Sequence, residues 1–199
     1  MKILAFSDLH RDKNAAWSLR DAARAADVVI GAGDFGTRGE GLADTFDILR
    51  DITVPVLVVA GNHDNLAEMQ AANRGWPHLH VLHGSGVAIG GTPFFGLGYE
   101  IPATNEASWN QRLAEAEAEE LLAACPDKAV LVTHSPPYGV ADLQRNGRHE
   151  GSRAIRAAIE RHQPQLVLCG HIHHAWGTMG AIGHSAVHNL GPSVNWFEI

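Results

Sequence analysis

The sequence is poor in cysteine, with only Cys125 and Cys169 among 199 residues. Two cysteines are too few for a disulfide framework, so we expect a reducing, cytoplasmic setting. A long apolar run is also missing, because the apolar stretch at the N-terminus ends at Asp8. That stretch is too short for a signal peptide or a membrane span, so we expect no membrane partner.

The sequence has no excess of basic residues either. Its 15 lysines and arginines against 22 aspartates and glutamates give a formal net charge of -7. A surface that binds nucleic acid usually carries a basic excess, so the composition argues against a nucleic-acid polymer as partner. Hydrophobic residues at 45% and aromatic residues at 7% are typical of a globular protein, and we expect residues 1–199 to form one domain. The sequence gives no indication of the oligomeric state.

Apolar runs alternate with helical patterns along the chain. Strands are expected at residues 2–6, 27–30, 54–60, 128–133 and 165–169, and helices at residues 14–26, 41–52, 106–124 and 152–162. Residues 78–99 and 181–199 indicate further short strands, which we expect to be antiparallel in the first of these segments. The alternation predicts an α/β fold of mixed sheets flanked by helices.

Histidine, with 13 residues, is the abundant residue of chemical interest. It is the commonest metal ligand in proteins. Side chains of ligand type follow the end of each expected buried strand, in the order Asp8 and His10, Asp34, Asn62, His134, and His171 with His173. Because sites in open α/β sheets form outside the carboxyl ends of the strands, we expect these side chains to converge.

The spacing of these residues is consistent with ligation of metal ions. Residues i and i+2 of an extended segment point to one side, so Asp8 with His10, and His171 with His173, are each expected to present two ligands together. Carboxylate, imidazole and amide oxygen without thiolate suit Mn, Fe, Zn, Co or Ni. Seven ligands exceed one four-coordinate ion and suit two ions about 3.5 to 4 Å apart, as in two-metal hydrolases.

The ordered motifs resemble those of the calcineurin-type metallophosphoesterase superfamily. They stand here as Asp8-x-His10, Gly33-Asp34, Gly61-Asn62-His63-Asp64, His134 and Gly170-His171-x-His173. The segments THSPPYG at 133–139 and CGHIHHAWG at 169–177 are similar to a branch of small metallophosphoesterase-domain proteins, some of which hydrolyse cyclic nucleotide phosphodiesters. The resemblance implies two mixed sheets packed face to face as a sandwich, with helices outside.

The resemblance also implies a role for each matching residue. One ion would be held by Asp8, His10 and His173, the other by Asn62, His134 and His171, with Asp34 bridging both and counted among the catalytic residues. His63 would be catalytic without being a ligand, and would give a proton or a hydrogen bond to the leaving oxygen. Asn62 and His63 would both contact the substrate. Thr37 stands where one common form of the family pattern has an acid, so no outer acidic group is expected there.

We therefore predict a phosphoesterase that uses two divalent or transition metal ions and a hydroxide bridging them to hydrolyse a small phosphoester. A phosphodiesterase, with cyclic nucleotides among its candidate substrates, is the first hypothesis. A phosphomonoesterase and a metal-binding regulatory protein with weak turnover are the alternatives. Residues 135–150 form a long polar loop that starts directly after His134, and its Arg145, Arg148 and His149 are predicted to bind substrate.

Three nearby features have simpler interpretations. His174 follows the last motif and, on an extended segment, would point away from the ligands. Asp64 or Asn65 is expected to cap the next helix, because both are favoured N-cap residues. The segment from Gly31 to Gly36 matches G-x-G-x-x-G, but it follows the second strand and carries Asp34 where a pyrophosphate would lie, so we do not expect a dinucleotide site.

Overall fold

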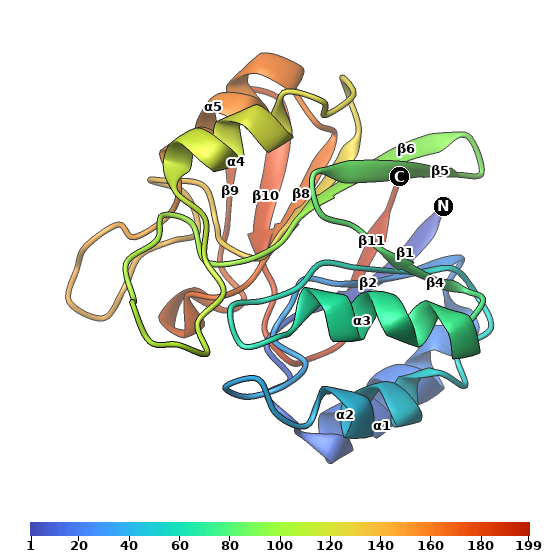
Figure 1. Ribbon diagram of the computed structural model, residues 1–199. Coiled ribbons are helices and arrows are strands. Elements are labelled where there is room, and N and C mark those ends of the chain that lie inside the picture. The colour runs from blue at the N-terminus through green and yellow to red at the C-terminus, as the bar shows by residue number, and fades with distance from the viewer.

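The computed structural model describes residues 1–199 and contains two mixed β-sheets (Figure 1). The first sheet has the order β11-β1-β2-β3-β4, with β1 Lys2–Phe6, β2 Val28–Gly31, β3 Val56–Val58, β4 Leu79–Val81 and β11 Asn195–Glu198. The second has the order β5-β6-β7-β8-β10-β9, with β5 Ser85–Ile89, β6 Thr92–Leu97, β7 Val130–Thr133, β8 Leu166–Cys169, β9 Met179–Ile182 and β10 Ser185–Asn189. Inner neighbours run parallel, while β11, β5 and β9 are antiparallel edge strands.

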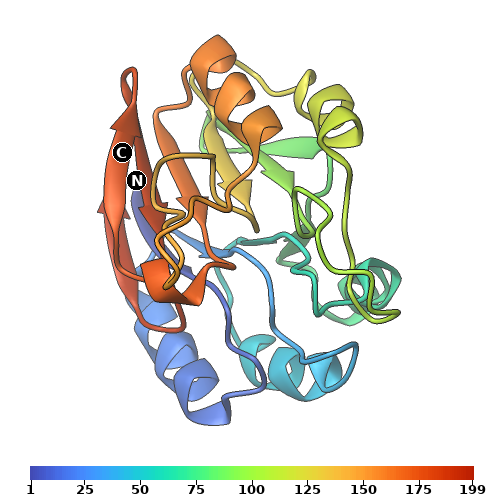
Figure 2. The ribbon, with the colours of Figure 1, turned by 90° about the vertical axis from the view of Figure 1, so that its left-hand side faces the viewer.

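The helices lie on the outer faces of the two sheets. The first sheet is covered by α1 Lys13–Ala22, α2 Leu42–Leu49 and α3 Leu66–Ala72, and the second by α4 Glu115–Leu122 and α5 Arg153–His162. Figure 2 shows the strands between α4 and α5 on one side and α1 and α2 on the other. This arrangement confirms the predicted sandwich of two mixed sheets flanked by helices.

The alternation of side chains along β1 shows how the layers are held together. Leu4 and Phe6 point into the apolar cluster under α1 to α3, whereas Ile3 and Ala5 point into the cluster between the sheets. Successive residues of a strand face opposite sides, so one short apolar strand fills two cores. A third cluster lies between the second sheet and α4 and α5.

Two predicted elements differ from the structure. The helix expected at 106–124 begins only at Glu115, because the chain before it pairs with other loops: Gln111 N donates to Asn62 O at 2.9 Å and Leu113 N donates to Glu100 O at 3.0 Å. Tertiary contacts here outweigh the helix propensity of the residues before Glu115. Within residues 78–99, only β5 and β6 form the expected antiparallel pair, since β4 adds to β3 in parallel.

The carboxyl ends of the inner strands of both sheets meet at one edge of the sandwich. Backbone hydrogen bonds connect the segments that leave them: Asp8 N donates to Gly33 O at 2.9 Å, and Gly170 N donates to His134 O at 2.9 Å. Tyr99 N, after β6, donates to Ala60 O, after β3, at 2.7 Å, which joins the two sheets. None of the helices combines the length and the apolar character that crossing a bilayer would take.

Candidate metal centre

Asp34 lies at the middle of the cluster of predicted ligands. Its Oδ2 atom is 3.4 Å from His10 Nε2, 3.5 Å from His134 Nε2 and 4.0 Å from His63 Nε2. The Asp34 side chain is only 2% exposed. A single buried carboxylate oxygen therefore faces imidazoles that arrive from three different loops.

The remaining ligands form one group on each side of Asp34. In the first group, His10 Nε2 is 3.2 Å from His173 Nε2, which is 3.7 Å from Asp8 Oδ1. In the second group, Asn62 Oδ1 is 2.9 Å from His134 Nε2 and 3.1 Å from His171 Nδ1. The structure thus brings all seven predicted ligands close together around Asp34, and their assignment to two ions stays a prediction.

The donor set fits two transition-metal ions. Ligand atoms about 2.1 Å from an ion in tetrahedral geometry lie about 3.4 Å from one another, close to the separations in both groups. His10 and His173 turn ring nitrogens toward each other, and such a pair needs a proton or a cation between its lone pairs. Asp34 belongs with His10 and His63 in one candidate cluster, and with Asp8 and His134 in another, which suits a carboxylate shared between ions.

The backbone at the ligands is not extended, in contrast to the prediction. Asp8, His10, Asp34 and His171 have φ angles of 56°, 45°, 60° and 68°. Non-glycine residues rarely adopt this left-handed region, and such strain is concentrated at functional sites. The paired side chains therefore meet through tight left-handed turns at the strand ends, and not through the i, i+2 alternation of the extended segment that was predicted.

Asp8 is oriented by contacts that sequence reasoning missed. Ser7 Oγ donates to Asp8 Oδ2 at 2.5 Å, and Trp176 Nε1 donates to the same atom at 3.0 Å. The Trp176 ring also packs on His173, with centroids 4.3 Å apart. Hydrogen-bond donors on one oxygen direct the other, Oδ1, toward the histidines. The only sequence signal for Trp176 was its place in the 169–177 motif.

The predicted capping role of Asp64 is wrong. Asn65 is the N-cap of α3, where its side chain accepts a hydrogen bond from Glu68 N at 3.1 Å. Asp64 is buried and turns back, and its carboxylate accepts hydrogen bonds from four backbone N–H groups, those of Asp34, Phe35, Gly36 and Gly61. It fixes the turn that presents Asp34. Burial, and then the charge of Asp34, raise its pKa to about 6.

The charges within the cluster depend on one another. Burial opposes ionisation of Asp34, but the neighbouring histidines, above all His134, lower its pKa below the ordinary value. Burial likewise opposes protonation of His134, yet Asp34 outweighs it and raises the His134 pKa to about 9. Burial, and then His134, lower the pKa of His171 to about 4. A metal ion would replace the proton on His134 as the charge that balances Asp34, since ligating histidines are neutral.

His63 faces the centre in a fixed orientation. Its Nδ1 atom accepts a hydrogen bond from Arg38 N at 2.8 Å, so the neutral ring carries its proton on Nε2, the nitrogen on the Asp34 side. Burial lowers its pKa, which favours this neutral form. Trp109, from the irregular segment before α4, stacks on the ring with centroids 4.5 Å apart and an interplanar angle of 28°. Sequence reasoning gave no role to Trp109.

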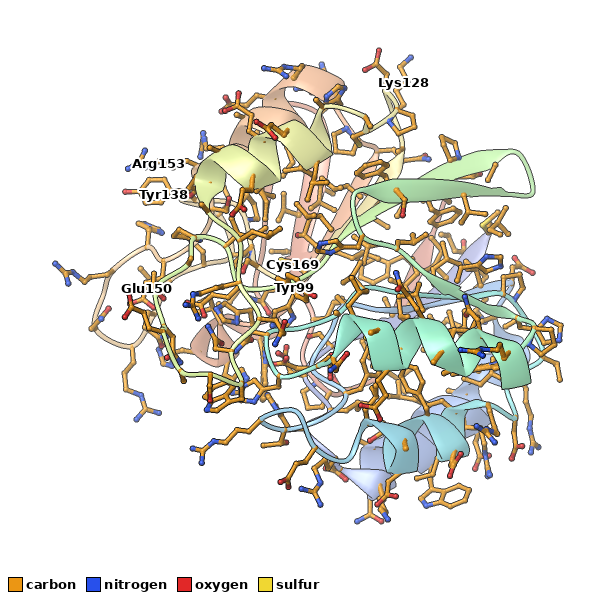
Figure 3. The ribbon with its side chains drawn as sticks, viewed as in Figure 1. Tyr99, Lys128, Tyr138, Glu150, Arg153 and Cys169 are labelled. Atoms are coloured by element: carbon orange, nitrogen blue, oxygen red, sulfur yellow. The ribbon has the colours of Figure 1, made fainter.

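A cleft of about 360 Å³ adjoins the centre at His171. Its lining includes His149, Tyr138, Arg153 and Glu150, and Figure 3 shows Tyr138 next to Arg153, with Glu150 farther along the same side of the molecule. His149 Nδ1 is 2.6 Å from Oδ1 of Asp142, a buried carboxylate that also accepts from Gly139 N and Gly151 N, both at 2.9 Å.

The other two loop residues predicted to bind substrate are placed differently. Arg145 and Arg148 are exposed and do not line the cleft. His174 is exposed too, but it lies in a 3-10 turn, His173–Ala175, and not on the extended segment that the sequence predicted. Of the three residues of the 135–150 loop that were predicted to bind substrate, only His149 therefore lines the cleft beside the centre.

The sequence and the fold of this chain are both similar to those of known proteins. The UPF0046 protein K07C11.7 of Caenorhabditis elegans is 32% identical over 198 residues, which cover 90% of this chain and 66% of that protein, so the chain spans just under two thirds of the relative's length. The structure of TT1561 of Thermus thermophilus is similar with a TM-score of 0.79 and 21% identity, over 98% of this chain and 97% of that one.

Two further solved structures share the fold at lower identity. A dimetal phosphatase from Danio rerio matches with a TM-score of 0.68 and 14% identity, over 96% of this chain and 88% of that one. A novel archaeal phosphodiesterase matches with a TM-score of 0.57 and 15% identity, over 96% and 84%. The family model described as calcineurin-like phosphoesterase matches residues 1–175, and the chain therefore belongs to the calcineurin-like phosphoesterase family.

Proposed function

We propose that this protein is a two-metal hydrolase of small phosphoesters, with a phosphodiester as its substrate. The observation that carries the proposal is the position of Asp34 Oδ2, 3.4 Å from a histidine of one ligand group and 3.5 Å from a histidine of the other. The family match and the name of the dimetal phosphatase neighbour support it.

The proposed metal ligands divide as the distances do. Asp8, His10 and His173 would hold one ion, Asn62, His134 and His171 the other, and Asp34 both. When bound, the two ions would supply a hydroxide at neutral pH, orient the phosphoryl oxygens and neutralise the charge that develops during in-line attack. The donor set suits Mn, Fe, Zn, Co or Ni.

His63 contributes a hydrogen bond at the reacting phosphate. Because Arg38 N occupies its Nδ1 atom, the ring offers Nε2–H toward the centre. A neutral imidazole holds this proton too tightly to release it as a general acid, since the product would be an imidazolate. Of the two roles that the motif left open, the geometry therefore supports a hydrogen bond to the phosphoryl or leaving oxygen, of the kind that stabilises charge in a transition state.

Three observations favour a diester over a monoester. The cleft beside His171 is lined by Glu100, Glu115 and Glu150 and by one guanidinium, that of Arg153. A diester brings one negative charge and a second organic group that this cleft has room for, whereas a monoester brings up to two charges toward an acidic wall. The archaeal phosphodiesterase neighbour and the 133–139 and 169–177 motifs point the same way.

A substrate panel tests the proposal. Protein reconstituted with each of the five metals is assayed on bis-p-nitrophenyl phosphate, on p-nitrophenyl phosphate and on cyclic nucleotides, with Asp34→Asn as the inactive control. We expect the highest kcat/KM on a diester. A higher value on the monoester would establish the phosphomonoesterase alternative, and no turnover by protein that holds two ions would establish the regulatory one.

We further propose a cytoplasmic setting, since Cys125 and Cys169 are buried and unpaired.

A further inference from the structure

We infer that Asn110, itself oriented by Glu100, is a positioning residue that turns the amide oxygen of Asn62 toward the metal centre. The inference rests on the proposed metal centre and extends it to a segment that carries none of the family motifs. Asn110 lies in the irregular chain between β6 and α4, 48 residues from Asn62 in the sequence. Both side chains are buried, at 5% exposure each.

The orientation of the Asn62 amide decides whether Asn62 can be a ligand at all. An amide oxygen has lone pairs to offer an ion, whereas an amide NH₂ group has only protons. A half-turn about the last side-chain bond exchanges the two atoms with little change in shape. Asn62 Oδ1 lies 2.9 Å from His134 Nε2 and 3.1 Å from His171 Nδ1, so the oxygen faces the other two proposed ligands of this group.

Asn110 fixes this orientation from behind. Asn62 Nδ2 donates to Asn110 Oδ1 at 2.7 Å, on the side away from the histidines. If the Asn62 amide turned over, its oxygen would meet the oxygen of Asn110, and two buried acceptors would lie in contact without a proton between them. Such a buried, unsatisfied pair is strongly disfavoured.

The orientation of Asn110 is fixed in turn by two groups that can only accept. Its Nδ2 atom donates to the carboxylate Oε2 of Glu100, and also to the backbone carbonyl of Asn105 at 2.8 Å. A carboxylate and a backbone carbonyl have no protons to give, so the NH₂ group of Asn110 must face them and its oxygen must face Asn62. Glu100 is buried at 4% exposure and is held by Thr104, whose N–H and Oγ1 both donate to Oε1.

The orientation of the amide is thus set in two steps, from Glu100 to Asn110 and from Asn110 to Asn62. Each step uses a neutral or charge-assisted hydrogen bond between buried groups, where alternatives that leave a group unpaired are costly. A backbone hydrogen bond also holds the two segments next to each other, because Gln111 N donates to Asn62 O at 2.9 Å. Groups that orient a metal ligand from outside the coordination sphere typically affect metal affinity about 10- to 100-fold.

A double-mutant cycle separates positioning from a merely structural role. Binding of Mn²⁺ is followed by isothermal titration calorimetry in the wild type, in Asn110→Ala, in Asn62→Asp and in the double variant. A carboxylate at position 62 presents an oxygen in either orientation, so it needs no partner to direct it. When position 62 is the native Asn62, we expect Asn110→Ala to weaken one of the two Mn²⁺-binding steps about 10- to 100-fold. In the Asn62→Asp background, we expect Asn110→Ala not to weaken that step.

Ser108→Ala is the matched control, because Ser108 is exposed and lies on the same segment. It should leave both steps unchanged, and circular dichroism with thermal melting of each metal-free variant checks folding. An equal loss in both position-62 backgrounds, an equal loss in Ser108→Ala, or unchanged binding in Asn110→Ala would each overturn the inference while leaving the metal centre intact. Failure of the wild type to bind two ions would overturn both the inference and the proposed function.

Discussion

Asp34 is the residue through which the two halves of the centre interact. It stands on a left-handed turn with φ of 60°, and Gly61 packs so closely on it that an added Cβ there would overlap Asp34 Oδ1. His63 N donates to that same Oδ1 atom at 2.9 Å, which leaves Oδ2 toward the histidines. Position and orientation are therefore fixed before any ion binds.

Asp34→Asn is expected to weaken both metal ions together and to abolish hydrolysis. A neutral amide compensates two cations poorly, and each ion loses the same charge. Calorimetric titration with Mn²⁺ measures both affinities, and Asn62→Ala serves as the comparison because it should weaken mainly one ion. Retention of both ions and most of the rate in Asp34→Asn would show that another group bridges them.

His63 faces the centre without being one of the proposed ligands. As a neutral Nε2–H donor held by Arg38 and Trp109, it would contribute a hydrogen bond in the proposed reaction, and loss of one such donor typically lowers kcat about 10²- to 10³-fold. His63→Ala should show this loss with both ions retained. His63→Gln, whose amide NH₂ is also a neutral donor, should recover part of it, measured as kcat on one diester. If His63→Gln were no better than His63→Ala, proton transfer would regain support over a hydrogen bond.

The turn between β3 and α3 shows how one element supports another. Asp64 gathers four backbone N–H groups, three of them from the turn after β2 that carries Asp34. A buried polar group left without its partner typically costs about 1 to 3 kcal/mol. In Asp64→Asn the side chain has only one accepting oxygen, so at least one of the four N–H donors would face an NH₂ group. Gly36 N is the donor that this change would affect most.

Asp64→Asn is therefore expected to lower the free energy of unfolding by about 1 to 3 kcal/mol and to weaken metal binding. Urea unfolding of the metal-free protein measures the first effect, and Mn²⁺ titration the second. Asn65→Ala, which removes the cap of α3 at a typical cost of about 1 kcal/mol, should reduce stability without touching the metals. Equal metal binding in both variants would mean that the Asp34 turn holds its shape without Asp64.

The loop from 135 to 150 is organised by the buried Asp142, and only one of its predicted substrate contacts lines the cleft. We expect His149→Ala to raise KM several-fold or to shift substrate preference, with both ions still bound. The paired change Arg145→Ala with Arg148→Ala should leave KM within error, because both side chains are exposed and lie outside the cleft lining. Steady-state kinetics on the diester panel measure KM for both variants. An increase in KM only in the paired arginine variant would mean that the loop closes over bound substrate with its arginines.

The whole molecule shows what a sequence can and cannot reveal about such a site. Apolar runs located most inner strands, and because ligands follow strand ends, the residues from Asp8 to His173 could be grouped in advance. The left-handed turns at Asp8 and Asp34 could not, since they depend on contacts between loops distant in the sequence. Asn110 and Trp109 were assigned to an expected helix. The local sequence shows that this segment has the composition of a helix, but it does not show the pairing with distant loops that replaces the helix.

Metal binding at the proposed centre should also stabilise the whole fold. The proposed ligands follow the ends of β1, β2 and β3 in one sheet and of β7 and β8 in the other, so an ion on either side of Asp34 would join the two sheets. An ion that binds only the folded state stabilises it by about 2.7 kcal/mol when present at 100 times its dissociation constant. For a protein of this size each kcal/mol raises Tm by about 2 to 4 °C.

Removal of metal by a chelator should therefore lower Tm by about 5 to 11 °C for one ion at that saturation, and by more for two. Differential scanning calorimetry of the wild type with Mn²⁺ and after chelation measures the change. Asp34→Asn, with its centre already weakened, should melt at nearly the same temperature in both conditions. If the wild-type Tm did not change when metal is removed, the two sheets would be held together by their apolar interface alone. The proposed ligands from the two sheets would then serve the reaction without contributing to stability.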